Sequence, residues 1–500
     1  MMISLLSKNP NKSKKSGENS QLTVLSDLNF DQILDRICLE WDSELRKMYE
    51  SFPSSKEDED YRKDIYQDFK KDDVYEIMSG HYSLIRERRE YSARKEDAYE
   101  LIQKQTWYLR EIHTYVSSLE LMHDKLGNSS CSSEGLKELS AFLDGYLSDE
   151  NFRNMSNIIN ALWKELSDFH VILTYEKGRF TLTNGVTEGA YDKFLSECFP
   201  EEHHTMTNPF AGTEYFSDLE NEIIKLFQRK NHSFFKKLEK FCKDYPEVFS
   251  EQISVFESEI PYYLAFAKFQ RSMKEHGFDM CTASKSDDTL SASGLYDLAL
   301  ALTNMDNGKE TVPNELFMDK GESFFVLTGP NQGGKTTYAR SLGQLIYFNK
   351  MGLDVPACSS SVPYYTNLWT HFSVEESIES GRGKLMDELE RLKPIMHESQ
   401  EGAFIVINEL FTTAANYDAI EMGRRVLDYL TGIKCRGIYV THLGELSKNS
   451  KGVVSLIACV DENNVQTFKI ERNTPAEATY INRQVLKYHL TYEQLKERFS

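Results

Sequence analysis

The chain has 500 residues, 40% hydrophobic and 12% aromatic, which is enough for two or three domains with sizeable cores. Its formal net charge of -20 argues against nonspecific coating of nucleic acid, so any DNA site has to be a local basic patch on an acidic surface. Eight cysteines without a C-x-x-C pair indicate neither a zinc site nor a disulfide framework, and favour a reducing, cytoplasmic location. No run approaches the roughly 20 apolar residues of a membrane helix, so no membrane partner is expected.

The first 22 residues are rich in Lys, Ser and Asn. Their apolar start, Met2 to Leu6, is too short for the hydrophobic region of a signal peptide. We therefore expect residues 1–22 to form a disordered tail.

Residues 23–293 are polar and mainly helical in pattern. Apolar residues recur at three- and four-residue spacing after Asp27, a plausible N-cap, and again from Ser217 to Phe241, where the pattern predicts one long amphipathic helix. The core stripes of a helical bundle are the simplest account of both. Basic side chains on the second helix can meet phosphates, although a solvated face is the default: Lys225, Arg229, Lys230, Lys236, Lys237, Lys240 and Lys243.

One segment of this region has a different period. Residues 169–183 alternate β-branched and aromatic side chains around Glu176, Lys177 and Gly178. This alternation with a short turn predicts a β-hairpin inserted between helices.

From about Gly294 the pattern changes to strands alternating with helices. Gly329 to Thr336 read GPNQGGKT and fill every fixed position of the phosphate-binding pattern G-x-x-x-x-G-K-[ST], between a buried strand and a helix. In that setting backbone N–H groups face the phosphates of ATP, Lys335 adds positive charge and Thr336 can bind Mg²⁺. The residues expected to bind the nucleotide are Gly329, Pro330, Asn331, Gln332, Gly333, Gly334, Lys335, Thr336 and Thr337.

Two further buried strands end in polar residues suited to hydrolysis. The strand Phe404 to Ile407 is followed by Asn408 and Glu409, a Walker B arrangement in which Glu409 is the expected general base. Asn408 can hold Mg²⁺ through water but supplies no charge, so weaker Mg²⁺ binding is expected. The alternative is that Asn408 and Glu409 only cap a core strand. His442, after the third strand, can sense the γ phosphate.

Taken together, these elements resemble the MutS proteins of DNA mismatch repair between Val312 and Ser447. The similar elements are Val312-Pro313-Asn314, Thr328 to Lys335, Val355-Pro356-Ala357, Ser380-Gly381-Arg382, Asn416-Tyr417-Asp418, and Thr441-His442 with Glu445-Leu446. The resemblance implies an ABC-type ATPase in which two subunits sandwich nucleotide, and thus a homodimer. One subunit's signature segment then faces the other's γ phosphate: Ser380, Gly381, Arg382, Gly383 and Lys384.

The departures from the family pattern point to slow turnover. Gly383 and Lys384 stand where the family signature has Ser-Thr, and Asn408 stands where it has Asp. The family's DNA clamp would be reduced here to the predicted hairpin, with Lys177 and Arg179 as candidate DNA contacts, although an ordinary surface hairpin is the alternative. No mismatch-recognition domain fits before Asp27, so recognition of single mismatches does not follow.

The sequence therefore predicts a mainly α-helical core and lever region over residues 23–293 with a small β insertion. An α/β P-loop ABC-type ATPase domain follows over residues 294–500. The expected activity is hydrolysis of ATP with Mg²⁺, coupled to mismatched, branched or distorted DNA in mismatch repair or recombination, with a repair protein as a further candidate partner. The alternative is a nucleotide-gated scaffold with little ATPase activity that acts through a protein partner.

Overall fold

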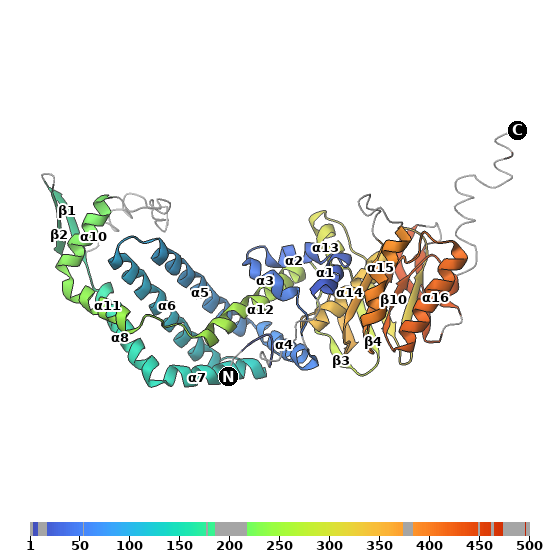
Figure 1. Ribbon diagram of the computed structural model, residues 1–500, viewed down its shortest axis with the longest axis horizontal. Coiled ribbons are helices and arrows are strands. Elements are labelled where there is room, and N and C mark those ends of the chain that lie inside the picture. The colour runs from blue at the N-terminus through green and yellow to red at the C-terminus, as the bar shows by residue number, and fades with distance from the viewer. Residues whose placement is uncertain are drawn as a thin grey trace. The chain divides into compact units, whose positions relative to one another are not determined.

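The computed structural model describes residues 4–8, 18–53, 55–176, 179–185, 218–373, 384–448, 451–461, 465–473 and 496 (Figure 1). It divides into two compact units. Unit 1 consists of Met1–Lys70, Ser133–Gly135 and Glu259–Ser500, and unit 2 of Lys71–Ser132 and Leu136–Ser258.

Unit 2 is mainly helical. In chain order it contains α5 (Asp72–Asp97), α6 (Leu101–Gly127), α7 (Glu134–Ser148), α8 (Glu150–Ser167), β1 (Val171–Glu176), β2 (Arg179–Asn184), α10 (Asp218–Lys230), α11 (His232–Asp244) and the first turns of α12 (Glu251–Glu275). The antiparallel pairing of β1 with β2 confirms the predicted hairpin.

The single helix predicted from Ser217 to Phe241 is wrong, because two helices, α10 and α11, meet at Asn231. The side-chain amide of Asn231 donates to the carbonyl of Phe227 at 3.1 Å. Asparagine side chains compete with the helical ladder in this way, so an uninterrupted apolar stripe can still span a helix break.

Unit 1 begins with a short anchored segment rather than a free tail. Leu5 is fully buried, and its backbone N–H donates to the carboxylate of Glu259 at 2.5 Å. The hydroxyl of Tyr263 donates to the carbonyl of Leu5 at 2.5 Å. The disordered tail predicted for residues 1–22 is therefore wrong at these residues, because a buried leucine and satisfied backbone groups hold them.

Four helices follow: α1 (Glu18–Asp27), α2 (Phe30–Cys38), α3 (Ser43–Tyr49) and α4 (Lys56–Phe69). Asp27 is the last residue of α1, and the N-cap of α2 is Asn29 in the left-handed conformation, so the predicted cap at Asp27 is wrong. The ring centroids of Phe30 and Tyr347 are 4.0 Å apart, and Tyr347 belongs to the C-terminal part of the chain. Contacts of this kind place α1 to α4 in unit 1, which corrects the domain boundary expected near Gly294.

Two sheets form the rest of unit 1. The larger has the order β12-β11-β6-β10-β9-β8, and all its neighbouring strands are parallel except β12 with β11. Its strands are β6 (Phe324–Thr328), β8 (Leu368–Phe372), β9 (Phe404–Asn408), β10 (Arg436–Val440), β11 (Val453–Val460) and β12 (Gln466–Arg472). The smaller has the order β3-β7-β4-β5: β3 (Ser284–Ser286), β4 (Leu290–Leu295), β5 (Asn314–Met318) and β7 (Ser359–Pro363).

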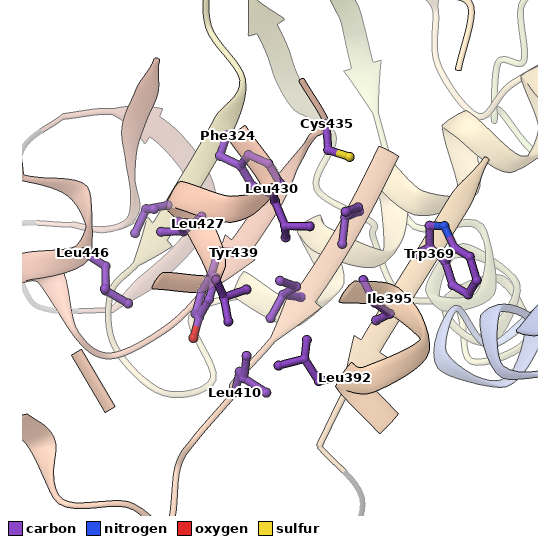
Figure 2. Packing of buried hydrophobic residues seen from close by; sticks show 14 of the residues in the cluster. Phe324, Trp369, Leu392, Ile395, Leu410, Leu427, Leu430, Cys435, Tyr439 and Leu446 are labelled. Atoms are coloured by element: carbon purple, nitrogen blue, oxygen red, sulfur yellow. The ribbon is translucent and has the colours of Figure 1, made fainter. Parts of the chain in front are cut away.

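Helices accompany the strands, as the predicted alternation requires. They are α13 (Leu298–Asp306), α14 (Lys335–Lys350), α15 (Lys384–Glu398), α16 (Asn416–Gly432) and the short 3-10 helix η2 (Gly444–Ser447). Figure 2 shows the buried cluster that Leu392 and Ile395 of α15, Leu427 and Leu430 of α16 and Tyr439 of β10 help to form. All residues of β6, β8 and β9 are buried, which is typical of parallel strands covered on both faces.

Gly437 is the position in β10 where the sheet tolerates no side chain. A Cβ atom there would lie 2.0 Å from the carbonyl oxygen of Ile405 and 2.8 Å from the ring of Phe324. Because both neighbours belong to paired central strands, neither can give way cheaply.

We predict that Gly437→Ala lowers the free energy of unfolding by about 3 kcal/mol or more, through overpacking in the central strand. The matched control is Gly432→Ala at the end of α16, where an added Cβ meets nothing within 4 Å. The control is expected to be neutral or to gain up to about 1 kcal/mol from helix propensity. Urea unfolding of both variants measures the difference, and equal midpoints would contradict the packing argument.

Candidate functional site

The loop between β6 and α14 is shaped by its glycines. Gly329 has φ 136° and Gly334 has φ 85°, conformations that other residues rarely adopt. At Gly329 a Cβ atom would also lie 2.9 Å from the Cβ of Ala458 in β11. Gly334 is the N-cap of α14 and offers no side-chain acceptor, so the N–H groups of the helix's first turn remain available to an anion.

Lys335 occupies the first position of α14 and is only 5% exposed. Its ammonium donates to the carbonyl oxygens of Gly329 at 2.8 Å and Pro330 at 3.0 Å. Burial lowers the pKa of Lys335, and the nearby carboxylate of Glu409 opposes that shift. The loop thus holds a positive charge beside the N-terminus of α14.

Thr336 and Asn408, the two residues predicted to hold Mg²⁺, are in direct contact. The Thr336 hydroxyl donates to Oδ1 of Asn408 at 3.1 Å. A hydroxyl and an amide oxygen are weak, uncharged ligands, so these two residues suit a magnesium ion whose other ligands are water and phosphate oxygens. The described residues contain no cluster of three or more His, Cys, Asp or Glu side chains that would hold a metal by themselves.

Glu409 follows β9 and faces His442, which follows β10. Their side chains approach to 3.1 Å between Oε1 and Nε2. Glu409 has φ 54°, and its backbone N–H donates to the carbonyl of Val440 at 3.0 Å. The bond to β10 fixes the strained residue at the sheet edge, so the carboxylate and the imidazole are presented together.

Backbone strain gathers around this site. Six non-glycine residues of the described chain have positive φ, and four of them lie here or in the loop after Glu409: Gln332, Glu409, Phe411 and Phe468. Such conformations cost about 1–3 kcal/mol each and persist where the surrounding structure enforces them. Their concentration at one edge of the sheet makes that edge the candidate functional region.

A cavity of about 660 Å³ opens beside the glycine-rich loop. Lys335, Thr336, Glu409 and His442 line it, so the structure brings the predicted residues into one concave site. Asn331, Gln332, Gly334 and Thr337 of the predicted set also line it. The volume is within the range of about 300–1,000 Å³ that small-molecule sites occupy.

Phe468 is a residue of this cavity that the sequence pattern did not reveal. It lies in β12 with φ 57°, is 45% exposed, and its ring approaches Gly334. The side-chain amide of Asn314 holds β12 at Phe468, because it donates to the carbonyl of Phe468 at 3.0 Å and accepts from the N–H of Ile470 at 2.9 Å. Asn314 belongs to the Val312-Pro313-Asn314 motif, but the positive φ that turns Phe468 toward the loop has no sequence signal.

Several predicted site residues cannot be placed in this way. Ser380, Gly381, Arg382 and Gly383 of the signature segment lie outside the described residues, and so does Lys177 of the hairpin turn. Lys384 begins α15 and Arg179 begins β2. Their expected roles therefore stay predictions.

Within the part of the chain that is described, no helix combines the length and the apolar character needed to cross a membrane.

Comparison with known proteins identifies the segment that carries this site. Residues 325–485 match the family described as MutS domain V. The DNA mismatch repair protein MutS of Pelotomaculum thermopropionicum is 29% identical over 171 residues, which cover 33% of this chain and 20% of that protein. The corresponding protein of Pseudothermotoga lettingae is 30% identical over 165 residues, 32% of this chain and 20% of the relative.

The matched part of the chain thus spans about a fifth of the length of these relatives. It includes β6, α14, β9, β10 and β11, the elements that position the glycine-rich loop, Glu409 and His442. The similarity of this chain to the MutS proteins thus lies in the segment that carries the site, residues 325–485, which match MutS domain V.

Proposed function

We propose that the chain binds and hydrolyses ATP at the cavity beside α14 and couples this reaction to DNA of unusual shape. The observation that carries the ATPase part is the convergence of Lys335, the Thr336–Asn408 pair and the Glu409–His442 pair at one edge of the sheet. These are the functions that phosphoryl transfer to water requires: a cation for phosphate, a metal site and a base for water.

Each residue has a distinct task in this proposal. The N–H groups of the first turn of α14 and the ammonium of Lys335 bind the β and γ phosphates. Thr336 would bind Mg²⁺ directly and Asn408 through water, and the ion would neutralise charge that develops on the phosphates. Glu409 orients and deprotonates the attacking water, and His442 stands beside it to meet the γ phosphate.

The remainder of the cavity suits the nucleoside. The exposed ring of Phe468 provides a flat apolar surface near Gly334, and Tyr296, Leu300 and Val312 line the same cavity. A planar base gains contact area from such a wall. Both the phosphate end and the apolar end of the cavity therefore support ATP as the ligand.

We predict that Glu409→Gln lowers steady-state ATP turnover by about 100-fold or more, because a general base contributes about 10²–10⁴ in rate. Nucleotide affinity should stay within about twofold, since Lys335 and the loop are untouched. The matched control is Glu401→Gln, an exposed glutamate of the same unit paired with Lys434. Equal turnover in wild type and Glu409→Gln would remove Glu409 from the catalytic role.

The rate of ATP turnover should also show which DNA the chain binds. We would compare turnover without DNA and with duplex, mismatched and four-way-junction DNA. Stimulation by one of these DNAs, lost in Glu409→Gln, supports a DNA-responsive ATPase. A flat background rate in every sample favours the alternative function, a nucleotide-gated scaffold acting through a protein partner, for which the missing carboxylate at Asn408 is the specific observation.

We predict that Asn408→Asp lowers the Mg²⁺ concentration for half-maximal nucleotide binding by about tenfold, because it places a charged ligand 3.1 Å from the Thr336 hydroxyl. A tenfold change corresponds to about 1.4 kcal/mol. Binding of a fluorescent ATP analogue across a Mg²⁺ titration measures it. Asn349→Asp, near the far end of α14, adds the same charge as a control, and an unchanged midpoint in Asn408→Asp would refute the metal assignment.

The DNA partner rests on the relatives, which are named for DNA mismatch repair, and on one basic feature of unit 2. Arg94 lies over the ring of Trp107 at 5.2 Å, and Arg110 lies over the same ring at 5.3 Å. Arg110 also approaches the rings of Tyr91 at 5.7 Å and Trp163 at 5.9 Å. Among the described residues no ion pair joins either guanidinium to a carboxylate.

Stacking on rings holds the two guanidinium planes while their N–H groups keep their donor capacity. In a chain with a net charge of -20, two arginines that pair with no carboxylate of the described residues form the kind of local basic patch that a phosphate backbone requires. Lys177 and Arg179 of the hairpin stay further candidates for DNA contact in the same unit.

We predict that the double variant Arg94→Gln with Arg110→Gln weakens DNA binding by about tenfold or more and reduces the slope of log affinity against log salt by about two. Lys237→Gln is the control, because Lys237 is already paired with Glu165 at 2.9 Å. Fluorescence anisotropy with labelled junction DNA at several salt concentrations gives both quantities. Unchanged affinity and slope would exclude these arginines as phosphate contacts.

A dimer is the assembly that we propose for the working state. The signature segment precedes α15, and the resemblance places it against the nucleotide of a second subunit. Light scattering with and without ATP and Mg²⁺ tests this directly: nucleotide should shift the chain to twice its mass, and a mass that never changes would contradict the clamp.

A further inference from the structure

Glu388 is a buried carboxylate that the proposed reaction does not yet use. It lies on α15, is 4% exposed, and its Oε2 accepts the backbone N–H of Phe411 at 3.0 Å. Phe411 stands two residues after Glu409, and both residues have left-handed backbone, with φ 63° and 54°. The carboxylate of Glu388 therefore holds the strained loop that presents the proposed base.

The position of Glu388 is itself fixed by its surroundings. His371 of β8 is 1% exposed and approaches the backbone carbonyl of Glu388 at 3.2 Å through Nε2. Burial, aided by the charge of Arg391, lowers the pKa of His371 to about 4, so the ring is neutral and its Nε2–H donates to that carbonyl. Leu392 and Ile395, one and two turns further along α15, pack into the buried cluster of Figure 2.

Arg391, one turn after Glu388, binds the other side of the helix to the rest of the unit. Its guanidinium donates to the carbonyl of Phe372 at 2.5 Å and to both carboxylate oxygens of Asp27 at 3.0 and 3.1 Å. Asp27 also accepts from the hydroxyl of Thr370 at 2.8 Å. Its backbone carbonyl accepts from Nε of Arg340 at 3.0 Å, and Arg340 lies on α14.

These contacts form one continuous connection. It runs from the loop of Glu409 through Glu388 and Arg391 of α15, then through Asp27 of α1, to the helix that carries Lys335 and Thr336. The residue at the start of α15 is Lys384, which closes the predicted signature segment. A displacement of α15 therefore has to move the loop of Glu409, because the buried hydrogen bond at Phe411 joins them.

We propose that Glu388 is a positioning residue for Glu409: its hydrogen bond to Phe411 keeps the base in the conformation that faces the attacking water. The inference rests on the proposed hydrolysis of ATP. Without the acceptor, Phe411 loses its bond to α15, and the bond of Glu409 to Val440 alone has to hold the two left-handed residues, so the loop relaxes to conformations in which Glu409 is turned away. ATP binding does not depend on this loop, since Lys335 and α14 bind the phosphates.

The test compares Glu388→Ala with Glu388→Gln, because glutamine keeps an oxygen that can accept the same N–H. We expect turnover to fall about tenfold or more in the alanine variant, while KM and the affinity for a nonhydrolysable ATP analogue stay within about twofold. The glutamine variant should recover at least half of wild-type turnover. Glu398→Ala, at the exposed far end of α15, is the control and should behave as wild type.

A second measurement does not need turnover. Amide hydrogen exchange of the peptide containing Phe411 should be slow in wild type, faster in Glu388→Ala and slow again in Glu388→Gln. A wild type without ATPase activity would overturn the proposed hydrolysis, and exchange would then decide whether Glu388 holds the loop. Unchanged exchange, equal loss in both variants, or a parallel loss of turnover and nucleotide affinity would each overturn the inference.

Discussion

The parallel pairing of β6, β10 and β9 is the constraint on which the candidate site depends. Val440 lies opposite Leu327 on one side and Asn408 on the other, so the carboxyl ends of three strands meet at one edge. Each strand delivers one part of the site there: the glycine-rich loop, the Asn408–Glu409 step and His442. Parallel strands place ligands at this edge because the loops after them diverge toward helices.

The helix α14 then joins this edge to the N-terminal helices of the same unit. Gln344 donates to the carbonyl of Leu28 at 3.0 Å, and the hydroxyl of Tyr347 donates to the carbonyl of Tyr49. The ammonium of Lys350 pairs with the buried carboxylate of Glu59 at 2.5 Å. Segments distant in sequence are therefore attached to the C-terminal half of the helix that begins at the glycine-rich loop, so a shift of α14 would strain α1 to α4 directly.

The sequence predicted the parts of the site that depend on local pattern. The glycine loop, the strand before it, the strand before Glu409 and the β-hairpin follow from spacing and residue type, which act within about ten residues. The positive φ of Phe468 and the contact of Glu388 with Phe411 depend on partners that only the folded chain supplies. The helix break at Asn231 is local, but the apolar stripe that runs across it gives no sign of it. The anchoring of Leu5 by Glu259 and Tyr263 has the same cause, since those partners lie more than 250 residues away.

Asn408 connects the proposed metal site to the packing around it. The residue is 6% exposed at the end of a fully buried strand, where a carboxylate without a bound cation would lack compensation for its lost hydration. The amide avoids that cost and still accepts the Thr336 hydroxyl at 3.1 Å. The Thr336–Asn408 contact thus forms without a metal, and in the proposed reaction the charge of Mg²⁺ would have to be balanced by phosphate and by Glu409. If Glu409 balances the metal, it is a weaker base. An amide rather than a carboxylate at position 408 thus avoids a cost in folding but slows the proposed hydrolysis.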